Sequence, residues 1–276
     1  MCRAKCQGIK SKPGKCKTQQ NQLIKLTVAM ELADPKKIVQ GEQKMDGQLN
    51  PSDFVGMSFW IISAAMVAAT FFFWVERDRA VGKWKTSLTV AAMVTGIAAI
   101  HYFYMRDVWA ETGASPLVFR YVDWLLTVPL QIIEFYLILA AIAVVGASIF
   151  WRLMIASVVM LVAGYLGEVG TFNVWGAFVV GMAAWIYIIY EIFIGEASKI
   201  SAENGTEASK TAFNALRLIV TVGWAIYPLG YVLGYVGAGS PEALNIIYNL
   251  ADFVNKIAFG VVIWAAATSS SASETA

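Results

Sequence analysis

The chain has 276 residues, of which 58% are hydrophobic and only 14% are charged, and its formal net charge is +2. This composition is too apolar for an ordinary soluble domain, and the near-neutral charge argues against a nucleic-acid-binding protein. Residence in a membrane is therefore the first expectation.

The first 48 residues form a polar, basic tail. Residues 1–46 contain ten Lys and Arg against four Asp and Glu, a net charge of +6, whereas residues 47–276 contain eleven against fifteen, a net charge of −4. Lys25 interrupts the short apolar stretch of the tail, which argues against a secretory signal. All three cysteines lie here without a histidine to complete a zinc site: Cys2, Cys6 and Cys16. We expect residues 1–48 to be disordered or to derive from an expression vector.

Seven apolar segments follow, each long enough to cross a bilayer at about 1.5 Å per residue. Their predicted ranges are 51–75, 84–105, 116–140, 147–167, 174–194, 208–236 and 241–267. The fold class is therefore predicted to be all-α, a bundle of seven transmembrane helices within residues 49–268. Residues 269–276 are predicted to be a C-terminal tail.

Three of these segments begin with a capping residue followed by proline, a pattern typical of helix N-termini. The three pairs are Asn50-Pro51, Ser115-Pro116 and Ser240-Pro241. Pro129 and Pro228 instead fall inside segments, where a kink is tolerated if neighbours satisfy the freed carbonyl group.

Basic residues in the connections predict the orientation across the membrane. The even-numbered connections contain only Arg106, whereas the odd-numbered ones are basic. The basic residues of the odd-numbered connections are Arg77, Arg79, Lys83, Lys85, Arg152, Lys199 and Lys210. Because positive charge accumulates on the cytoplasmic side, the odd-numbered connections are predicted to be cytoplasmic and the start of the first helix to lie outside.

The second segment carries His101, the only histidine of the chain, toward its outer end. A lone buried histidine is usually a core residue with satisfied hydrogen bonds. This one lies at about the depth predicted for Asp123 in the next segment, and a His–Asp pair would couple the titrations of both groups. Both a structural histidine and a functional partner of Asp123 fit this position.

The third segment carries a polar stripe, whose members are three or four residues apart and therefore share one helix face. The stripe consists of Arg120, Asp123, Thr127, Gln131 and Glu134. Thr127 lies one turn from Asp123 and can hydrogen-bond it. A polar seam that only holds helices together is the alternative, but it would use small or neutral residues more readily than two carboxylates and an arginine.

Asp123 and Glu134 are separated by about 16 Å along a helix axis, which is around half the thickness of the hydrocarbon core. One carboxylate is thus predicted in the outer half of the membrane and the other in the inner half. Proton-exchanging groups on either side of a central amine are what vectorial proton transfer requires.

The seventh segment supplies such an amine, because Lys256 lies near the middle of its apolar run. An ammonium group in hydrocarbon costs several kcal/mol unless it is paired or used. Asp252 lies four residues earlier on the same helix face. A structural ion pair is one interpretation; the other is an amine used covalently, as in Schiff-base lysines, with the carboxylate as its counter-charge.

Aromatic residues recur at helical spacing inside the segments: Tyr102, Trp124, Trp185, Trp224, Tyr227 and Tyr231. Core packing or anchoring at the membrane interface explains any one of them. As a set they could form a flat, apolar slot around an elongated conjugated ligand.

Four stretches of the chain resemble the microbial rhodopsins and, within them, the proteorhodopsins. These stretches are RYVDWLLTVP at 120–129, WAIYP at 224–228, NLADFVNK at 249–256 and FWVERDR at 73–79. The resemblance covers about residues 53–267. It implies a light-driven outward proton pump of the bacterial inner membrane, not an enzyme, with all-trans retinal bound to Lys256 as a protonated Schiff base.

The resemblance also implies a role for each candidate site residue. Asp123 would be the proton acceptor and primary counterion, Asp252 the second counterion, and Glu134 the cytoplasmic proton donor. Arg120 would stabilise this cluster, and His101 would pair with the acceptor. The aromatic positions implied around the chromophore or its counterions are Tyr102, Trp124, Trp185, Trp224, Tyr227 and Tyr231.

Three residues of the stripe identify the subclass by resemblance. Asp123, Thr127 and Glu134 together match proton-pumping proteorhodopsins, whereas sodium-pumping, chloride-pumping and sensory relatives usually carry other sets. At the position of Gln131, leucine accompanies green absorption and glutamine blue, since an amide dipole there favours the charge distribution of the ground state. The resemblance therefore implies a blue-absorbing form.

Two other functions compete with the proton pump. Blue-absorbing members can cycle slowly, so a photosensory rhodopsin read by a partner protein is the first alternative. A seven-helix receptor without retinal, in which Lys256 is unused, is the second.

The family also forms rings of subunits, so the resemblance implies a homo-oligomer in membrane lipids, a pentamer or a hexamer. Trp60 matches a residue that can reach His101 of a neighbouring protomer. No metal and no nucleic-acid partner are expected.

Overall fold

A computed structural model describes residues 49–275, although not the side chains of 272–275. The predicted basic tail and its cysteines lie outside the described residues. The described part belongs to one compact unit, Leu49–Ala276.

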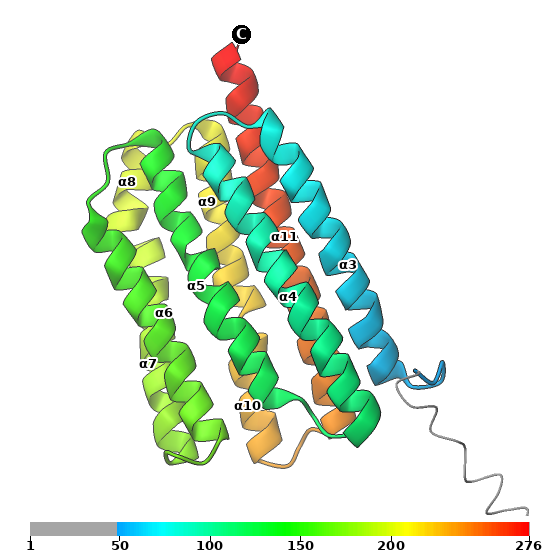
Figure 1. The fold of residues 1–276 in the computed structure, drawn as a ribbon. Coiled ribbons are helices and arrows are strands. Elements are labelled where there is room, and N and C mark those ends of the chain that lie inside the picture. The colour runs from blue at the N-terminus through cyan, green and yellow to red at the C-terminus, as the bar shows by residue number, and fades with distance from the viewer. Residues whose placement is uncertain (1–48, 276) are drawn as a thin grey trace, which may run out of the picture. The chain divides into compact units, whose positions relative to one another are not determined.

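Seven helical spans, each long and apolar enough to cross a membrane, make up this unit (Figure 1). The long helices are α3 (Phe54–Glu76), α4 (Trp84–Thr112), α5 (Leu117–Ile142), α6 (Ala147–Glu168), α7 (Val174–Phe193) and α11 (Pro241–Thr275). The sixth span consists of α9 (Glu207–Leu218), η2 (Ile219–Gly223) and α10 (Ile226–Tyr235). Two short helices, η1 (Arg77–Arg79) and α8 (Glu196–Asn204), follow α3 and α7. Residues 49–275 contain no strand, so the predicted all-α seven-helix bundle is confirmed.

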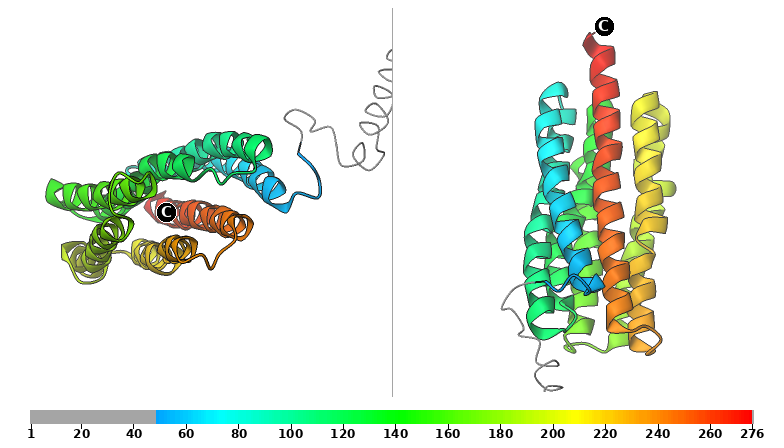
Figure 2. Two further views of the ribbon diagram at one scale, coloured as in Figure 1. Left: turned by 90° about the horizontal axis from the view of Figure 1, so that it is seen from below. Right: turned by 90° about the vertical axis from the view of Figure 1, so that its right-hand side faces the viewer.

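Successive helices from α3 to α7 pack as neighbours, and α11 closes the bundle against α3, α4, α9 and α10 (Figure 2). The five residues of the predicted polar stripe on α5 are all buried, with at most 2% of each exposed. Large apolar side chains such as Phe71 and Ile100 instead cover the outside of the bundle. Because lipid tolerates an apolar surface and water does not, this chain is a multi-pass membrane protein.

The predicted capping pattern is right at α11 and wrong at α5. At α11, the Ser240 hydroxyl accepts a hydrogen bond from the backbone N–H of Ala243 at 3.2 Å. Before α5, the Ser115 hydroxyl donates to Asn245 Oδ1 at 3.1 Å, and Pro116 occupies the cap position without a side-chain bond. A partner from a distant helix thus replaces the local cap, which a local sequence pattern does not reveal.

The start of α3 also differs from its prediction, because Asp53 rather than Asn50 is the N-cap. Asp53 Oδ1 accepts the backbone N–H of Gly56 at 3.0 Å. Its second oxygen, Oδ2, accepts the indole N–H of Trp109 near the end of α4 at 2.9 Å. One carboxylate therefore both caps α3 and joins it to α4.

We expect Asp53→Ala to lower the free energy of unfolding by about 2–3 kcal/mol, since it removes a helix cap and leaves a buried indole N–H without an acceptor. Denaturation of the protein in mixed detergent micelles measures this change. Asn50→Ala serves as the control and should change stability by less than about 0.5 kcal/mol. Equal losses in the two variants would contradict the assignment of the cap.

The sixth span is not the continuous helix that its hydropathy predicts. A π-helical turn, η2, divides it, and a turn at Trp224 and Ala225 precedes α10. Pro228 in the next turn has no N–H to donate, so the helix cannot regain a regular hydrogen-bond ladder at once.

Residues 269–276, predicted to be a tail, continue α11 as far as Thr275. The stretch contains Ala, Ser, Thr and Glu but no Gly or Pro, so nothing in it stops a helix. Ser271 ties it to the first connection, because its hydroxyl accepts the backbone N–H of Val81 at 3.0 Å and donates to Ala267 O at 2.7 Å.

Candidate functional site

The centre of the bundle holds one amine between two carboxylates. Lys256 Nζ on α11 lies 2.9 Å from Asp123 Oδ2 on α5 and 3.0 Å from Asp252 Oδ2, one turn earlier on α11. Each of these side chains is at most 2% exposed. The predicted pairing of Lys256 with Asp252 is therefore present, and Asp123 provides a second carboxylate. Since buried charges persist only when they are paired and hydrogen-bonded, the cluster needs the further donors around it.

Asp252 receives most of these donors. The hydroxyl of Tyr102 donates to Asp252 Oδ2 at 2.7 Å, and the hydroxyl of Tyr227 donates to Oδ1 at 2.7 Å. The indole N–H of Trp124 donates to Oδ1 at 3.1 Å. With the amine of Lys256, side chains from α4, α5, α10 and α11 surround this carboxylate and stabilise its negative charge.

Asp123 is bound more sparsely. His101 Nδ1 lies 3.3 Å from Asp123 Oδ1, but the same nitrogen lies 3.0 Å from the backbone carbonyl of Ile97, and Asp123 Oδ1 makes no hydrogen bond. The structure therefore brings the predicted His–Asp pair together without a direct hydrogen bond. Thr127 differs from its prediction: its hydroxyl donates to the backbone carbonyl of Asp123 at 3.0 Å and not to the carboxylate. This back-bonding within the helix is common for threonine.

Arg120 reaches the cluster only indirectly. Its Nη2 donates to Asn249 Oδ1 at 2.5 Å and to Asn245 Oδ1 at 3.0 Å, while Nη1 donates to the Tyr102 hydroxyl at 3.3 Å. No ion pair joins it to an acidic residue within the described part of the chain. Its charge acts on Asp252 through space and through the shared hydroxyl of Tyr102.

The two asparagines that hold Arg120 were not among the predicted site residues. A signal for them is present in the seventh segment, where polar residues recur every three or four positions along one face: Asn245, Asn249, Asp252 and Lys256. This periodicity predicts that Asn245 and Asn249 share the buried face of Asp252 and Lys256.

Glu134 lies on the same buried face of α5, about three helical turns beyond Asp123. It is completely buried, and neither of its carboxyl oxygens has a hydrogen-bond partner. The hydroxyl of Ser87 on α4 lies near Glu134, and this hydroxyl also has no hydrogen-bond partner. Glu134 therefore makes no hydrogen bond to the charged cluster around Lys256.

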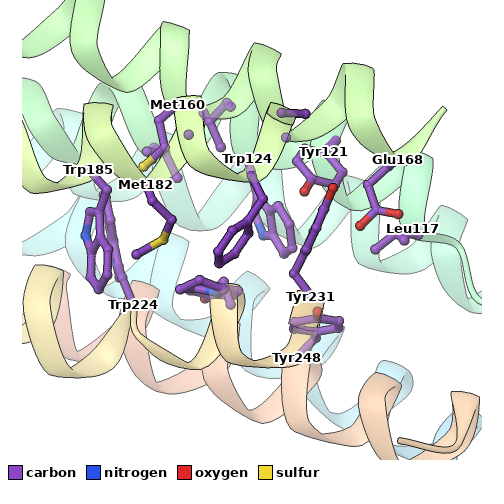
Figure 3. A pocket seen from close by; sticks show the side chains of 18 of the residues that line it. Leu117, Tyr121, Trp124, Met160, Glu168, Met182, Trp185, Trp224, Tyr231 and Tyr248 are labelled. Carbon is purple, nitrogen blue, oxygen red and sulfur yellow. The ribbon is translucent and has the colours of Figure 1, made fainter. Parts of the chain in front are cut away.

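A cavity lies between α5, α6, α7, α10 and α11, and Lys256 is one of its lining residues. Figure 3 shows the aromatic side chains that line it, among them Trp124, Trp185 and Trp224. Five of the predicted aromatic residues line it: Trp124, Trp185, Trp224, Tyr227 and Tyr231. Tyr102 does not line it and instead binds Asp252. Lining residues that were not predicted include Tyr121, Met160, Phe178, Met182 and Tyr248. Their types are ordinary for packed membrane helices, so periodicity alone gave no reason to select them.

Gln131 lies on the cavity wall near α11, where its Nε2 donates to the backbone carbonyl of Asn255 at 3.4 Å. The amide dipole is thus fixed beside the segment that carries Lys256. The predicted position of this residue next to the ligand slot agrees with the lining of the cavity.

The residues present fit an elongated, flat, apolar molecule that reaches the Lys256 amine. Indole and phenol rings supply broad apolar faces, and the buried carboxylates would balance a positive charge kept on the lysine nitrogen. No three His, Cys, Asp or Glu side chains within residues 49–275 are arranged to hold a metal ion.

Comparison with known proteins decides the family. Residues 53–270 match the family described as bacteriorhodopsin-like protein. The chain belongs to this family, the microbial rhodopsins. The predicted resemblance to microbial rhodopsins is therefore confirmed.

Two curated relatives are equally similar to this chain. The green-light absorbing proteorhodopsin of Gamma-proteobacterium EBAC31A08 is 57% identical over 220 residues, and the blue-light absorbing proteorhodopsin of Gamma-proteobacterium Hot 75m4 is 57% identical over 221 residues. Each match covers 79% of this chain and 88% of the relative. Overall identity therefore does not distinguish the two colours.

Solved structures agree on the fold. The crystal structure of blue light-absorbing proteorhodopsin from Med12 is 57% identical with a TM-score of 0.69, and it covers 79% of this chain and 100% of the other. Exiguobacterium sibiricum rhodopsin is 36% identical with a TM-score of 0.70, covering 79% and 97%.

Trp60 lies on the outer surface of α3, with 42% of its side chain exposed. The guanidinium carbon of Arg106 lies 5.4 Å from the centre of its ring, and Phe103 packs edge-on against it. Contact between Trp60 and a neighbouring protomer stays a prediction.

Proposed function

We propose that this chain is a retinal-binding, light-driven outward proton pump of the blue-absorbing proteorhodopsin kind, located in a bacterial inner membrane. The observation that carries the proposal is the buried Lys256 amine, held between Asp123 and Asp252 at the end of an aromatic cavity. The two proteorhodopsin relatives at 57% identity support the same function.

Retinal would be held by a covalent bond to Lys256 and by the aromatic walls formed by Trp124, Trp185 and Trp224. When bound, it supplies the absorption of visible light and a change of shape beside the lysine nitrogen. The walls exclude water from this nitrogen, and the carboxylates keep a proton on it in the dark.

Asp123 is the better proton acceptor for Lys256. Protonation of Asp252 would weaken bonds from three neutral donors as well as the ion pair with the amine. Protonation of Asp123 disturbs only its contacts with Lys256 and His101, and Oδ1 accepts no hydrogen bond that a proton there would displace. The sparser binding of Asp123 therefore lowers the cost of transferring a proton to it.

Glu134 is suited to return a proton to Lys256. Ionising a buried carboxyl group that has only the Ser87 hydroxyl nearby is expensive, so Glu134 holds a proton until the amine has lost its own. Glu134 lies about three turns further along α5 than Asp123, so the donor and the acceptor are on opposite sides of Lys256. A cycle of loss to Asp123 and gain from Glu134 moves a proton in one direction.

The direction is set by the orientation of the bundle. The basic residues Arg77, Arg79 and Lys83 lie between α3 and α4, and Lys85 lies in the first turn of α4, at the end of the bundle closer to Glu134. The positive-inside rule favours a cytoplasmic location for that end. With Glu134 on the cytoplasmic side and Asp123 on the outer side, net transport is outward.

Light-dependent pH changes test the function. Cells that express the chain and are supplied with retinal should acidify an alkaline medium under illumination, and a protonophore should abolish the signal. The Lys256→Ala variant should show no response and no visible absorption band, even though Asp123 and Glu134 are retained. A wild-type chain that binds retinal but produces no pH change would overturn the proposal.

Gln131 is proposed to set the blue absorption. We expect Gln131→Leu to shift the visible absorption band to longer wavelength, because it removes a dipole that favours the ground-state charge distribution beside Lys256. Light-driven proton transport should persist, since neither carboxylate is changed. An absorption spectrum of purified protein measures the shift, with the surface substitution Val122→Leu as a control; an unchanged band in Gln131→Leu would contradict the assignment.

A photosensory function is the second candidate, and one comparison favours it. The curated sensory rhodopsin-2 of Natronomonas pharaonis is 30% identical over 220 residues, covering 76% of this chain and 88% of the relative. The proton donor Glu134 favours transport, because a sensor has no need to refill the amine rapidly.

A further inference from the structure

The π-helix η2 deprives two backbone carbonyls of their normal partners. In a regular α-helix, Val220 O would accept from Trp224 N, and Gly223 O from Tyr227 N. In this chain Trp224 N donates to Ile219 O at 3.0 Å, and Tyr227 N donates to Trp224 O at 3.1 Å. Two carbonyl groups inside a membrane bundle therefore need donors from elsewhere.

Both carbonyls find a donor on a neighbouring helix. The indole N–H of Trp185 on α7 donates to Val220 O at 3.0 Å. The side-chain amide of Asn255 on α11 donates to Gly223 O at 3.0 Å. Position 223 requires glycine for this contact, because a Cβ atom there would overlap the Asn255 amide oxygen. The distortion of the sixth span is thus held by two side chains that belong to the surroundings of the candidate site.

Asn255 has further bonds within that site. Its side-chain nitrogen lies 3.3 Å from the hydroxyl of Tyr227, which itself donates to Asp252 at 2.7 Å. Its backbone carbonyl accepts the side-chain amide of Gln131 at 3.4 Å. Asn255 is 3% exposed and directly precedes Lys256. A single amide therefore bonds both the π-helix and the hydrogen-bond network of the counterion.

We propose that Asn255 is a positioning residue that couples the charge state around Lys256 to the π-helix of the sixth span. Loss of the proton from Lys256 removes the ion pair of Asp252. This carboxylate then accepts a stronger hydrogen bond from the Tyr227 hydroxyl. The shared Asn255 amide then shifts toward Tyr227 and weakens its bond to Gly223 O. The inference rests on the proposed function, because the proposed light cycle is what changes the charge on Lys256.

The weaker bond to Gly223 O affects the packing of α9, the cytoplasmic half of the sixth span. α9 packs against both α5 and α11, the helices that carry Glu134 and Lys256. When the Gly223 carbonyl loses its donor, the π-turn is less stable and α9 can repack against α5. Asn255 thereby links proton loss at the amine to the access of a proton to the side of the bundle that holds Glu134.

Amide hydrogen exchange of the retinal-loaded protein in lipid nanodiscs tests this coupling. In the wild-type protein, illumination should speed exchange within residues 219–227 by about tenfold through local opening. Asn255→Asp has the same shape but places an acceptor opposite the Gly223 carbonyl. It should show the fast exchange already in the dark, with no further increase in light. Val254→Ala, on the exposed side of α11, is the matched control and should behave as wild type.

Two results would overturn the inference: exchange in residues 219–227 that Asn255→Asp leaves unchanged in the dark, or wild-type exchange that does not respond to light. The dark comparison is repeated without retinal, so that it also gives a result if the chain transports no protons. A chain that pumps but shows no light-dependent exchange contradicts the coupling alone. A chain that shows the exchange effects without pumping contradicts the proposed function alone.

A double-mutant cycle provides a second test if Asn255→Asp does not fold. Gly223→Ala should shorten the thermal half-life of the pigment because its new methyl group collides with the Asn255 amide. In the Asn255→Ala background the methyl group has room, so the same substitution should have a several-fold smaller effect. Independent effects would contradict the contact. If the coupling holds, Asn255→Ala should also change the rate at which the Lys256 nitrogen regains its proton, which a purely structural role would leave unaltered.

Discussion

Asp123→Asn is expected to reduce light-driven proton transport by at least about 100-fold, because it removes the group that accepts the proton from Lys256. The amide also removes a negative charge 2.9 Å from the lysine nitrogen. The visible absorption band should therefore shift to longer wavelength, since the carboxylate stabilises the positive charge at that nitrogen most strongly in the ground state. Cell-suspension pH recordings and absorption spectra measure the two effects.

Asp107→Asn is a suitable control for this variant. Asp107 lies near the end of α4, where it pairs with Arg106 at 2.5 Å, and it does not contact the cluster around Lys256. It should leave both the pH signal and the spectrum unchanged. Persistent transport by Asp123→Asn would contradict the role of Asp123 and direct attention to Asp252.

Glu134→Gln is expected to slow the return of a proton to Lys256 by about 100-fold, the scale of a lost general acid. The dark spectrum should be nearly unchanged, because Glu134 has no bond to the cluster around the amine. Flash photolysis follows the decay of the state in which the lysine nitrogen is deprotonated. A membrane-permeant weak acid should accelerate this decay in the variant, since it delivers protons without Glu134.

Glu207→Gln, in the exposed first turn of α9, is the matched control for loss of a carboxylate on the same side of the bundle. Its decay rate should equal that of the wild type. If Glu134→Gln also leaves the decay unchanged, the chain does not use this residue as a donor, and the photosensory alternative gains support.

The seven spans were predictable because the hydrophobic effect acts on each segment separately. A run of about 20 apolar residues predicts a membrane helix whatever its neighbours are. Helix ends and irregularities depend on distant partners instead. Ser115 bonds Asn245 on another helix, and the π-turn before Pro228 relies on donors from α7 and α11. Such partners are known only once the bundle is assembled.

Part of the candidate site was also predictable from single segments. Helical periodicity places Asp123 and Glu134 on one face of α5, and the cost of a buried amine singles out Lys256. The hydrogen-bond partners could not be derived in this way. Thr127 bonds the backbone and not the carboxylate, and Arg120 is held by asparagines of α11. Rotamers and interhelical distances decide these pairings, and neither follows from spacing along one helix.

The central claim is that Asp123 and Glu134 serve opposite sides of Lys256, and proton movement resolved by side tests it most directly. Vesicles of uniform orientation, with one pH indicator inside and another outside, are excited by a single flash. A proton should be released on the face where α3 begins and taken up on the face where α9 begins, and Glu134→Gln should slow only the uptake. Release and uptake on the same face, or uptake that is insensitive to Glu134→Gln, would contradict the account.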